Sequence, residues 1–220
     1  TYQLALDDPS RAAGFVQIGT DQGLLAAPRQ LDTIVIAPAQ RFDVVIDFSK
    51  HEVGDQITLT NQLGSGPTAA VMRFVVARTA TDTSSVPAKL SQLDTITADP
   101  SAPRRTMRFH RAGTEWQING RVFDPAHSEA DVRAGTTELW TITSDFHHPF
   151  HVHNATMQVV SRDGRPPGPY DQGWKDTVFL DKGEKVQIAI RFSTYRGRYV
   201  FHCHNLEHED MGMMANFTIS

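Results

Sequence analysis

Six of the ten histidines in this 220-residue chain fall in two short segments. The first reads His-Pro-Phe-His-Val-His over residues 148–153, and the second begins His-Cys-His at residues 202–204 and continues to His208. Packing alone has no use for so many imidazoles in so few residues, whereas imidazole and thiolate are common ligands of transition metals. The two segments therefore predict a metal-binding protein. The four remaining histidines are expected to be ordinary surface or core residues.

Most of the chain consists of short runs of β-branched and aromatic residues separated by turn residues, as at 33–36, 42–48, 56–60 and 70–77. No long window has the 3.6-residue periodicity of an amphipathic helix. At most a single turn of helix is expected, at 38–41 or 207–211. The sequence therefore predicts an all-β protein.

A polar stretch rich in Ser, Thr, Asp and Pro lies between these runs and the next strand signal. It predicts a linker at 81–103 between a first unit, 1–80, and a second unit, 104–220. The alternative is one long surface loop within a single domain, although loops of this length are uncommon in compact domains.

The second unit contains seven or eight short predicted strands, at a spacing that suits an antiparallel Greek-key sandwich or barrel. The first unit has about half that number and is expected to be incomplete. The strands expected in the second unit are 107–109, 115–118, 137–143, 157–162, 176–180, 185–191, 198–202 and 215–219.

Strand geometry gives the histidine spacing a meaning, because residues i and i+2 of a strand face one side and the residue between them faces the other. His202 and His204 therefore share a face, and Cys203 points away from them. The same spacing places His151 and His153 on one face. One three-residue segment could thus contribute to two metal centres back to back.

His208 and Met213 follow Cys203 by five and ten residues, on a glycine-containing loop that can fold back towards the thiolate. One more histidine would complete the two His, one Cys and one Met of a blue-copper electron-transfer site. We assign that place to His148, because Pro149 is expected to form a turn that separates it from the histidines that follow. Zinc is the alternative metal, but a thioether is a poor ligand for zinc.

The two histidine segments resemble the third and fourth copper motifs of the multicopper oxidases, in particular the branch of bacterial and spore-coat laccases, cuprous oxidases and bilirubin oxidases. The motifs are His-Pro-Phe-His-Val-His and His-Cys-His-x3-His-x4-Met, and both are highly specific. Residues 15–25 and 36–48 resemble the latter part of the middle cupredoxin domain of that family, and the chain from about 104 resembles its third domain. The resemblance implies cupredoxin-like Greek-key β-sandwiches, one partial and one complete.

The resemblance also implies a role for each candidate residue. Glu209 looks like an acidic residue that this branch is thought to use in delivering protons to reduced dioxygen, and the alternative for it is a solvated loop carboxylate. The implied copper ligands are His148, Cys203, His208 and Met213 for the type 1 copper, His151 for the type 2 copper, and His153, His202 and His204 for the type 3 pair.

A complete enzyme of this family also needs two His-x-His motifs from its first cupredoxin domain, and this chain has no further motif of that kind. The expected partner is therefore an N-terminal fragment of the same protein that carries both motifs. We expect the two parts to stay associated, because half of a middle domain would otherwise expose its core and its strand edges. The alternative is an inactive fragment.

The implied activity is that of a laccase-type oxidase with four copper ions in the complete enzyme. Phenolic or other aromatic donors, or reduced metal ions, would lose single electrons at the type 1 copper, and the trinuclear cluster would reduce dioxygen to water. Two alternatives remain. An electron carrier would need only the type 1 site, and a copper nitrite reductase would use only one of the two histidines that flank Cys203.

Charge and hydropathy exclude two classes of partner. A net charge of −4 gives no electrostatic reason to bind nucleic acid or an anionic membrane. No stretch approaches the roughly 20 apolar residues that span a bilayer.

The chain has no initiator Met and no signal-like apolar segment, so it is expected to be soluble and a processed or truncated product. Export to the periplasm, envelope or coat is expected from the resemblance.

Overall fold

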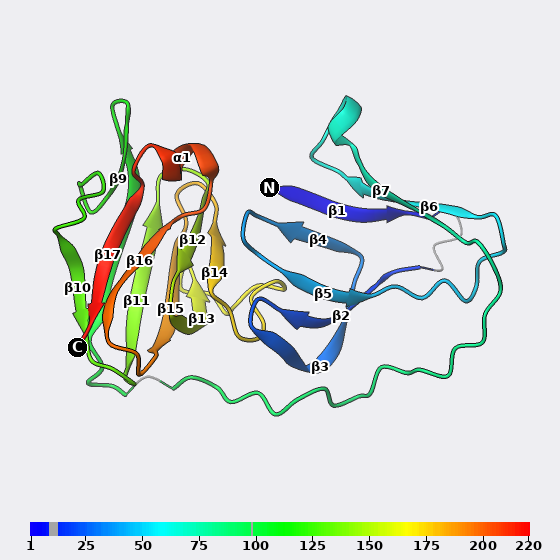
Figure 1. Ribbon diagram of the computed structural model, residues 1–220, viewed down its shortest axis with the longest axis horizontal. Helices are drawn as coiled ribbons and strands as arrows, with labels where there is room; N and C mark the ends of the chain where they lie inside the picture. The colour runs from blue at the N-terminus through cyan, green and yellow to red at the C-terminus, as the bar shows by residue number, and fades with distance from the viewer. Residues whose placement is uncertain (9–12, 98) are drawn as a thin grey trace. The chain divides into compact units, whose positions relative to one another are not determined.

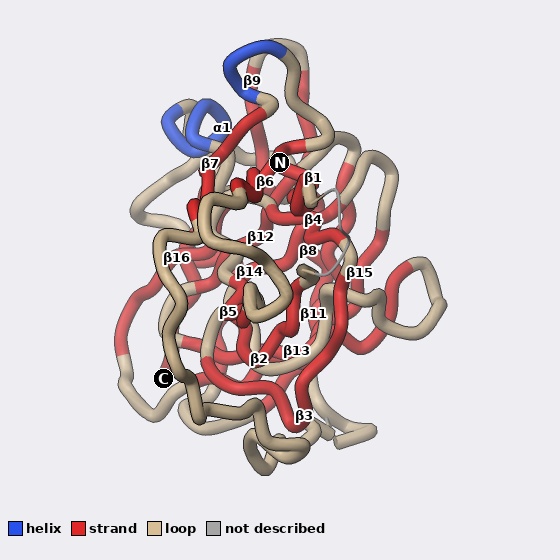
Figure 2. The backbone as a smooth tube through the Cα atoms, turned by 90° about the vertical axis from the view of Figure 1, so that its right-hand side faces the viewer, coloured by secondary structure: helices blue, strands red, loops and turns tan. Residues whose placement is uncertain are grey.

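The computed structural model describes residues 1–8, 13–97 and 99–220. The chain divides into two compact units, one spanning 1–37 and 41–93 and the other spanning 38–40 and 94–220. The boundary falls inside the expected linker, 81–103, whose described residues include no strand. Strands make up almost all of the regular structure (Figure 2). The all-β prediction is confirmed.

The described residues contain only two short helical segments, η1 (Gly66–Thr68) and α1 (Leu206–Asp210). The α1 helix coincides with the helical turn expected at 207–211. The other candidate, 38–41, contains a turn in which Ala39 has a φ of 67°. Neither helical segment is long and apolar enough to cross a membrane.

Within its described residues, the first unit contains seven strands in two sheets, with strand orders β4-β1-β6-β7 and β3-β2-β5. The expectation that the first unit has about half as many strands as the second was wrong. Gly, Pro and Gln interrupt the apolar pattern of the first three strands, and the pairing of these strands is set by tertiary contacts. The strands are β1 (Tyr2–Asp7), β2 (Phe15–Thr20), β3 (Gly23–Leu31), β4 (Thr33–Ile36), β5 (Phe42–Val45), β6 (Gln56–Asn61) and β7 (Ala70–Val75).

The first unit also has apolar surface that its own described residues leave uncovered. A cavity of about 460 Å³ is lined by apolar side chains from both of its sheets, among them Phe15 of β2 and Phe74 of β7. On β7, Val71, Met72 and Val75 are 45%, 49% and 56% exposed. An open apolar surface of this kind is typical of an interaction site.

Ten strands build the described part of the second unit, in two five-stranded sheets (Figure 1). One sheet has the order β10-β17-β16-β12-β14 and the other β13-β15-β11-β8-β9. The strands are β8 (Arg104–Ala112), β9 (Glu115–Ile118), β10 (Ser128–Val132), β11 (Thr137–Ser144), β12 (His148–Val152), β13 (Ala155–Arg162), β14 (Thr177–Leu180), β15 (Lys185–Phe192), β16 (Gly197–Cys203) and β17 (Met214–Ile219).

Three expectations for the second unit need correction. β10 and β12 were not expected, because charged residues in the first and a proline in the second weaken the strand signal. Pro149 lies inside β12 rather than in a turn, and its carbonyl accepts a hydrogen bond from the His204 amide at 2.8 Å. The sheets are not wholly antiparallel, since β8 pairs with β11 and β10 pairs with β17 in parallel.

The core of the second unit is a single cluster of buried hydrophobic side chains contributed by both sheets. Alternate residues of β11 are buried, as expected for a strand with one face against a core. Trp140 from β11 meets Phe201 from β16 edge to face, with ring centroids 5.4 Å apart. Cys203 and Met213 belong to the same cluster, so the core extends directly to the histidine segments.

Candidate metal centre

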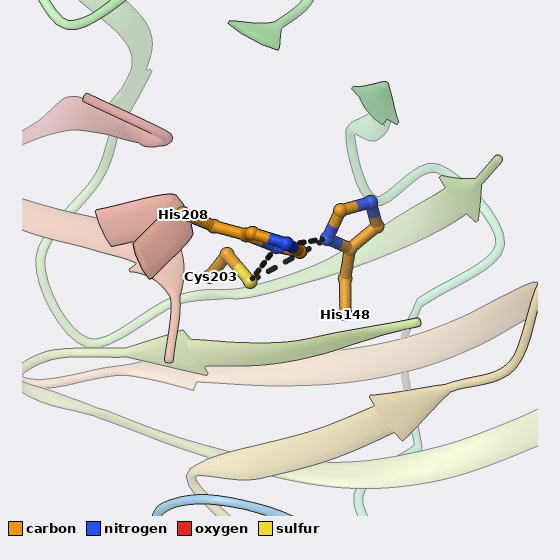
Figure 3. Close-up of side chains that lie close together, drawn as sticks. All are labelled: His148, Cys203 and His208. Carbon is orange, nitrogen blue, oxygen red and sulfur yellow. Dashed lines mark hydrogen bonds between the residues drawn. The ribbon is translucent and has the colours of Figure 1, made fainter. Parts of the chain in front are cut away.

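The side chains of His148, Cys203 and His208 lie close together within the second unit (Figure 3). We call these three residues the Cys203 triad. His148 begins β12, Cys203 ends β16 and His208 lies on α1. The two Nδ1 atoms are 3.2 Å apart, and the Cys203 Sγ lies 3.4 Å from each of them. His148 and Cys203 are fully buried and His208 is 8% exposed.

The chain after β16 turns back on itself to bring His208 and Met213 to Cys203. The Cys203 amide donates to the Met213 carbonyl at 3.0 Å, and the Met213 amide donates to the His208 carbonyl at 2.9 Å. Gly212 makes the return possible, because its φ is +86° and an added Cβ would lie 2.7 Å from Val122. Met213 is fully buried beside the triad.

The donor atoms of the triad are arranged to hold a cation. The Nε2 of His148 lies 3.4 Å from an Asp145 carboxylate oxygen, which places the ring proton on Nε2 and leaves a lone pair on Nδ1. That lone pair faces the His208 Nδ1 and the Cys203 sulfur in a buried site. Electron-rich donors this close need a proton or a metal ion between them, and two imidazoles with a thiolate suit copper.

Four other imidazoles gather on the opposite side of β16. We call His151, His153, His202 and His204 the four-imidazole group. The ring centroids of His151 lie 4.9 Å from His153, 5.3 Å from His202 and 5.5 Å from His204. The Nε2 atoms of His153 and His202 are 3.2 Å apart. Every histidine that sequence spacing assigned to a shared face therefore lies in this group.

Hydrogen-bond acceptors fix which ring nitrogen of this group is free for a metal. The Nδ1 of His151 lies 2.9 Å from the Thr177 hydroxyl and 3.1 Å from the Asp176 carbonyl. The Nδ1 of His202 lies 3.1 Å from the Cys203 carbonyl and 3.4 Å from a Glu209 carboxylate oxygen. Both contacts favour a proton on Nδ1 and leave the Nε2 lone pairs directed into the group.

Burial shapes the charge state of the ligand candidates. It lowers the pKa of His148 and of His202 from 6.5 to about 4, and it lowers the pKa of His153 and His208 as well. Burial raises the pKa of the Cys203 thiol to about 12. Without a metal these four imidazoles are thus neutral near pH 7 and the thiol keeps its proton, so a bound cation has to displace that proton.

The structure adds contacts that sequence reasoning missed. Trp116 stacks on His208 with ring centroids 3.7 Å apart, and Phe146 lies 6.3 Å from the same ring. Asp145 and Thr177 accept or share hydrogen bonds with His148 and His151. Asp145 lies only three residues before His148. The other contacts join segments that are distant in sequence, so nothing in the residue spacing indicated them.

Comparison with known proteins agrees with this geometry. Residues 85–220 match the family model described as multicopper oxidase. The chain is 34% identical to a laccase of Bacillus subtilis, over all of this chain and 48% of that protein. It is 38% identical to a bilirubin oxidase of Albifimbria verrucaria, over 92% of this chain and 39% of that protein. The chain thus spans about half, or less, of the length of these curated relatives.

Solved structures give the same picture. The McoA multicopper oxidase of Aquifex aeolicus superposes with a TM-score of 0.88 at 30% identity, over all of this chain and 52% of that one. A multicopper oxidase of Pediococcus acidilactici superposes with a TM-score of 0.88 at 28% identity, over all of this chain and 46% of that one. Both units of this chain therefore have counterparts in solved structures.

Proposed function

This chain belongs to the multicopper oxidase family, and from that premise we propose that it forms the type 1 site and half of the trinuclear cluster of a laccase-type oxidase. When bound, copper supplies the redox chemistry that couples one-electron oxidation of phenolic or other aromatic donors to the four-electron reduction of dioxygen to water. The activity is that of the complete protein.

One observation carries the proposal. Cys203 lies between His202 and His204 in the chain, its sulfur belongs to the Cys203 triad, and both neighbours belong to the four-imidazole group. Strand alternation sends the thiol and the imidazoles to opposite faces. A metal held by the thiol would thereby be linked to metals held by the imidazoles through one continuous path of covalent bonds. A simple electron carrier does not need that link.

The residues of the triad have complementary tasks in this proposal. His148, Cys203 and His208, with Met213 beside them, hold the type 1 copper. Asp145 orients the His148 ring by accepting a hydrogen bond from its Nε2. A histidine that binds a metal through one ring nitrogen is usually held in this way through the other. The surrounding hydrophobic cluster excludes water from the thiolate.

The four-imidazole group holds the copper ions of the cluster, His151 the type 2 ion and the other three histidines the type 3 pair. Thr177 of β14 and the carbonyl of Asp176, the residue before that strand, orient His151. The Cys203 carbonyl orients His202. These contacts present Nε2 lone pairs to one shared space.

Glu209 is proposed to deliver protons to the cluster. Its carboxylate lies 3.4 Å from the Nδ1 of His202, and its side chain is 30% exposed. A carboxyl that touches both water and a cluster histidine can hold a proton at its oxygen and release it inward, which is the task of a general acid.

We propose that a further portion of the protein, with two His-x-His motifs, completes the cluster. His153 is exposed and His151 and His204 are only half-buried, in contrast to the buried triad. The uncovered apolar cavity of the first unit is a natural place for the same portion to dock, because covering it removes apolar surface from water.

Aromatic side chains beside His208 support an aromatic donor. Phe146 is 45% exposed, and its ring centroid lies 6.0 Å from Trp116 and 6.3 Å from His208. Rings at such distances offer stacking and edge contacts to a phenol or an aromatic amine. The position of Phe146 next to a ligand ring gives a bound donor a short path to the type 1 copper.

The test measures dioxygen uptake by the copper-loaded complete protein with a phenolic donor. The proposal predicts four donor molecules oxidised for each dioxygen consumed, without release of hydrogen peroxide. Reduction of the copper by the donor without dioxygen uptake would favour an electron carrier. Uptake of nitrite in place of dioxygen would favour a nitrite reductase.

A further inference from the structure

The indole of Trp116 lies almost flat on the imidazole of His208. Their ring centroids are 3.7 Å apart and their planes differ by 27°. The same indole meets His148 edge to face, with centroids 5.7 Å apart and an interplanar angle of 81°. Trp116 therefore contacts both histidines of the Cys203 triad, although these come from β12 and α1, and it is itself only 8% exposed.

A cation is held against this indole. Arg111 of β8 is the cross-strand partner of Trp116 of β9, and its guanidinium carbon lies 5.2 Å from the indole centroid. The Arg111 amide donates to an Asp145 carboxylate oxygen at 2.8 Å, which ties β8 to the segment before His148. The β8–β9 hairpin thus delivers an aromatic ring and a positive charge to one face of the triad.

The helix that carries His208 cannot fix the ring by itself. α1 has five residues, and the side chain of its N-cap residue, Asn205, makes no capping hydrogen bond. The side-chain Nδ2 of Asn205 instead donates to the His147 carbonyl at 2.8 Å and lies 3.4 Å from the His208 Nδ1. The large planar contact on the His208 ring comes from Trp116, so this indole is the group that holds the ring plane.

We propose that Trp116, together with Arg111, is a positioning residue of the type 1 centre, which fixes the His208 ring, keeps water from its face and so raises the reduction potential of the copper. The inference rests on the proposed function of the triad. Reduction removes one positive charge from the bound ion. Exclusion of water and a nearby cation both disfavour the more highly charged oxidised form, and therefore favour the reduced one.

The experiment compares the reduction potential of the type 1 copper in the copper-loaded complete protein and in three variants, followed through the visible absorption of the oxidised site. Trp116→Leu should shift the ratio of oxidised to reduced copper at a fixed applied potential by about tenfold towards the oxidised form, as expected for loss of a contact beyond the ligands. Trp116→Phe, which keeps a ring on His208, should shift it less. Arg111→Gln should shift it in the same direction.

Arg191→Gln is the matched control, because Arg191 lies 5.2 Å from the indole centroid of Trp174 in a second Arg–Trp pair, and it should leave the potential unchanged. An unchanged potential in Trp116→Leu and Arg111→Gln, with the visible band intact, overturns this inference and leaves the proposed function standing. If Trp116→Leu does not fold, Trp116→Phe and Arg111→Gln serve as the test, and an unchanged potential in both overturns the inference. Absence of the band from the unaltered copper-loaded protein contradicts both proposals.

Discussion

His151 and His202 are register partners on strands β12 and β16, and their imidazole centroids lie 5.3 Å apart. The next pair in the same ladder joins Phe150 to Cys203. Because neighbouring residues of a strand face opposite sides, the first pair belongs to the four-imidazole group and the second to the side of the Cys203 triad. A slip of one residue would exchange these faces, so the β12–β16 register keeps the two groups separate.

Replacement of Cys203 by serine is expected to abolish the intense visible absorption and to lower oxidase activity at least about a hundredfold, because a hydroxyl cannot supply the thiolate of a blue-copper site. Cys203 is the only cysteine in the chain, so no other thiol can replace it. Visible spectroscopy and dioxygen uptake measure the two effects.

Met211→Leu is the control for this substitution, because Met211 lies between His208 and Met213 in the chain but its side chain is 51% exposed and is not expected to bind metal. It should keep both the colour and the activity. A Cys203→Ser protein that retained its visible band would overturn the assignment of the triad.

Glu209→Gln is expected to slow dioxygen reduction about tenfold or more while the visible band of the type 1 site is retained, because an amide cannot hold and release the proton that a carboxyl can. Single-turnover reoxidation of the reduced protein by dioxygen measures this step. Glu207→Gln, an exposed position on the same helix, is the control. Equal reoxidation rates in the Glu209 variant and the unaltered protein would make Glu209 an ordinary solvated carboxylate.

Thr177→Val is expected to weaken copper binding in the cluster about tenfold or more, because the hydroxyl 2.9 Å from the His151 Nδ1 is replaced by a methyl group of the same size. Thr177 is fully buried, so water cannot take the place of the hydroxyl. Copper content after mild chelation, together with the electron paramagnetic resonance signal of the type 2 ion, measures the loss. The type 1 band should stay unchanged, and a cluster as resistant to chelation as before would argue against this role.

Acidification is expected to destabilise the copper-free protein. Burial lowers the pKa of His148 and of His202 from 6.5 to about 4. Between these values the unfolded chain binds protons that the folded chain does not, so the free energy of unfolding falls as the pH falls through this window. Below about pH 4 these two groups cause no further loss. At about 1.4 kcal/mol for each pKa unit, the two histidines together lower the free energy of unfolding by an amount on the order of several kcal/mol.

Chemical denaturation of the chelator-treated protein at about pH 7 and about pH 5 tests this pH dependence. His147→Gln serves as the control, because the His147 side chain is 49% exposed beside the site and its loss should leave the pH dependence in place. The same denaturation midpoint at both pH values would contradict the expectation.

Local strand geometry allowed the division of the histidines into two groups to be predicted from the sequence. The alternation of side chains in His202-Cys203-His204 depends only on the strand itself, and the same holds for the spacing of His151 and His153. The all-β class and most strands of the second unit could be predicted from short apolar runs. The family could be predicted from the two histidine motifs.

Features that depend on pairing between distant strands could not be predicted. Trp116 reaches His208 because the β8–β9 hairpin packs near α1, and Thr177 reaches His151 because these two residues are register partners on β14 and β12. Pro149 was assigned to a turn because proline is rare inside strands, yet here β12 accommodates it between β14 and β16.

The most direct test of the account is a copper count on the purified native protein, combined with the intact mass of every polypeptide in it. We predict about four copper ions for each copy of this chain. We also predict that the measured masses include a further portion of polypeptide, which carries the two additional His-x-His motifs. About one copper ion for each copy, with no such additional portion, would contradict the oxidase and leave only an electron-transfer site.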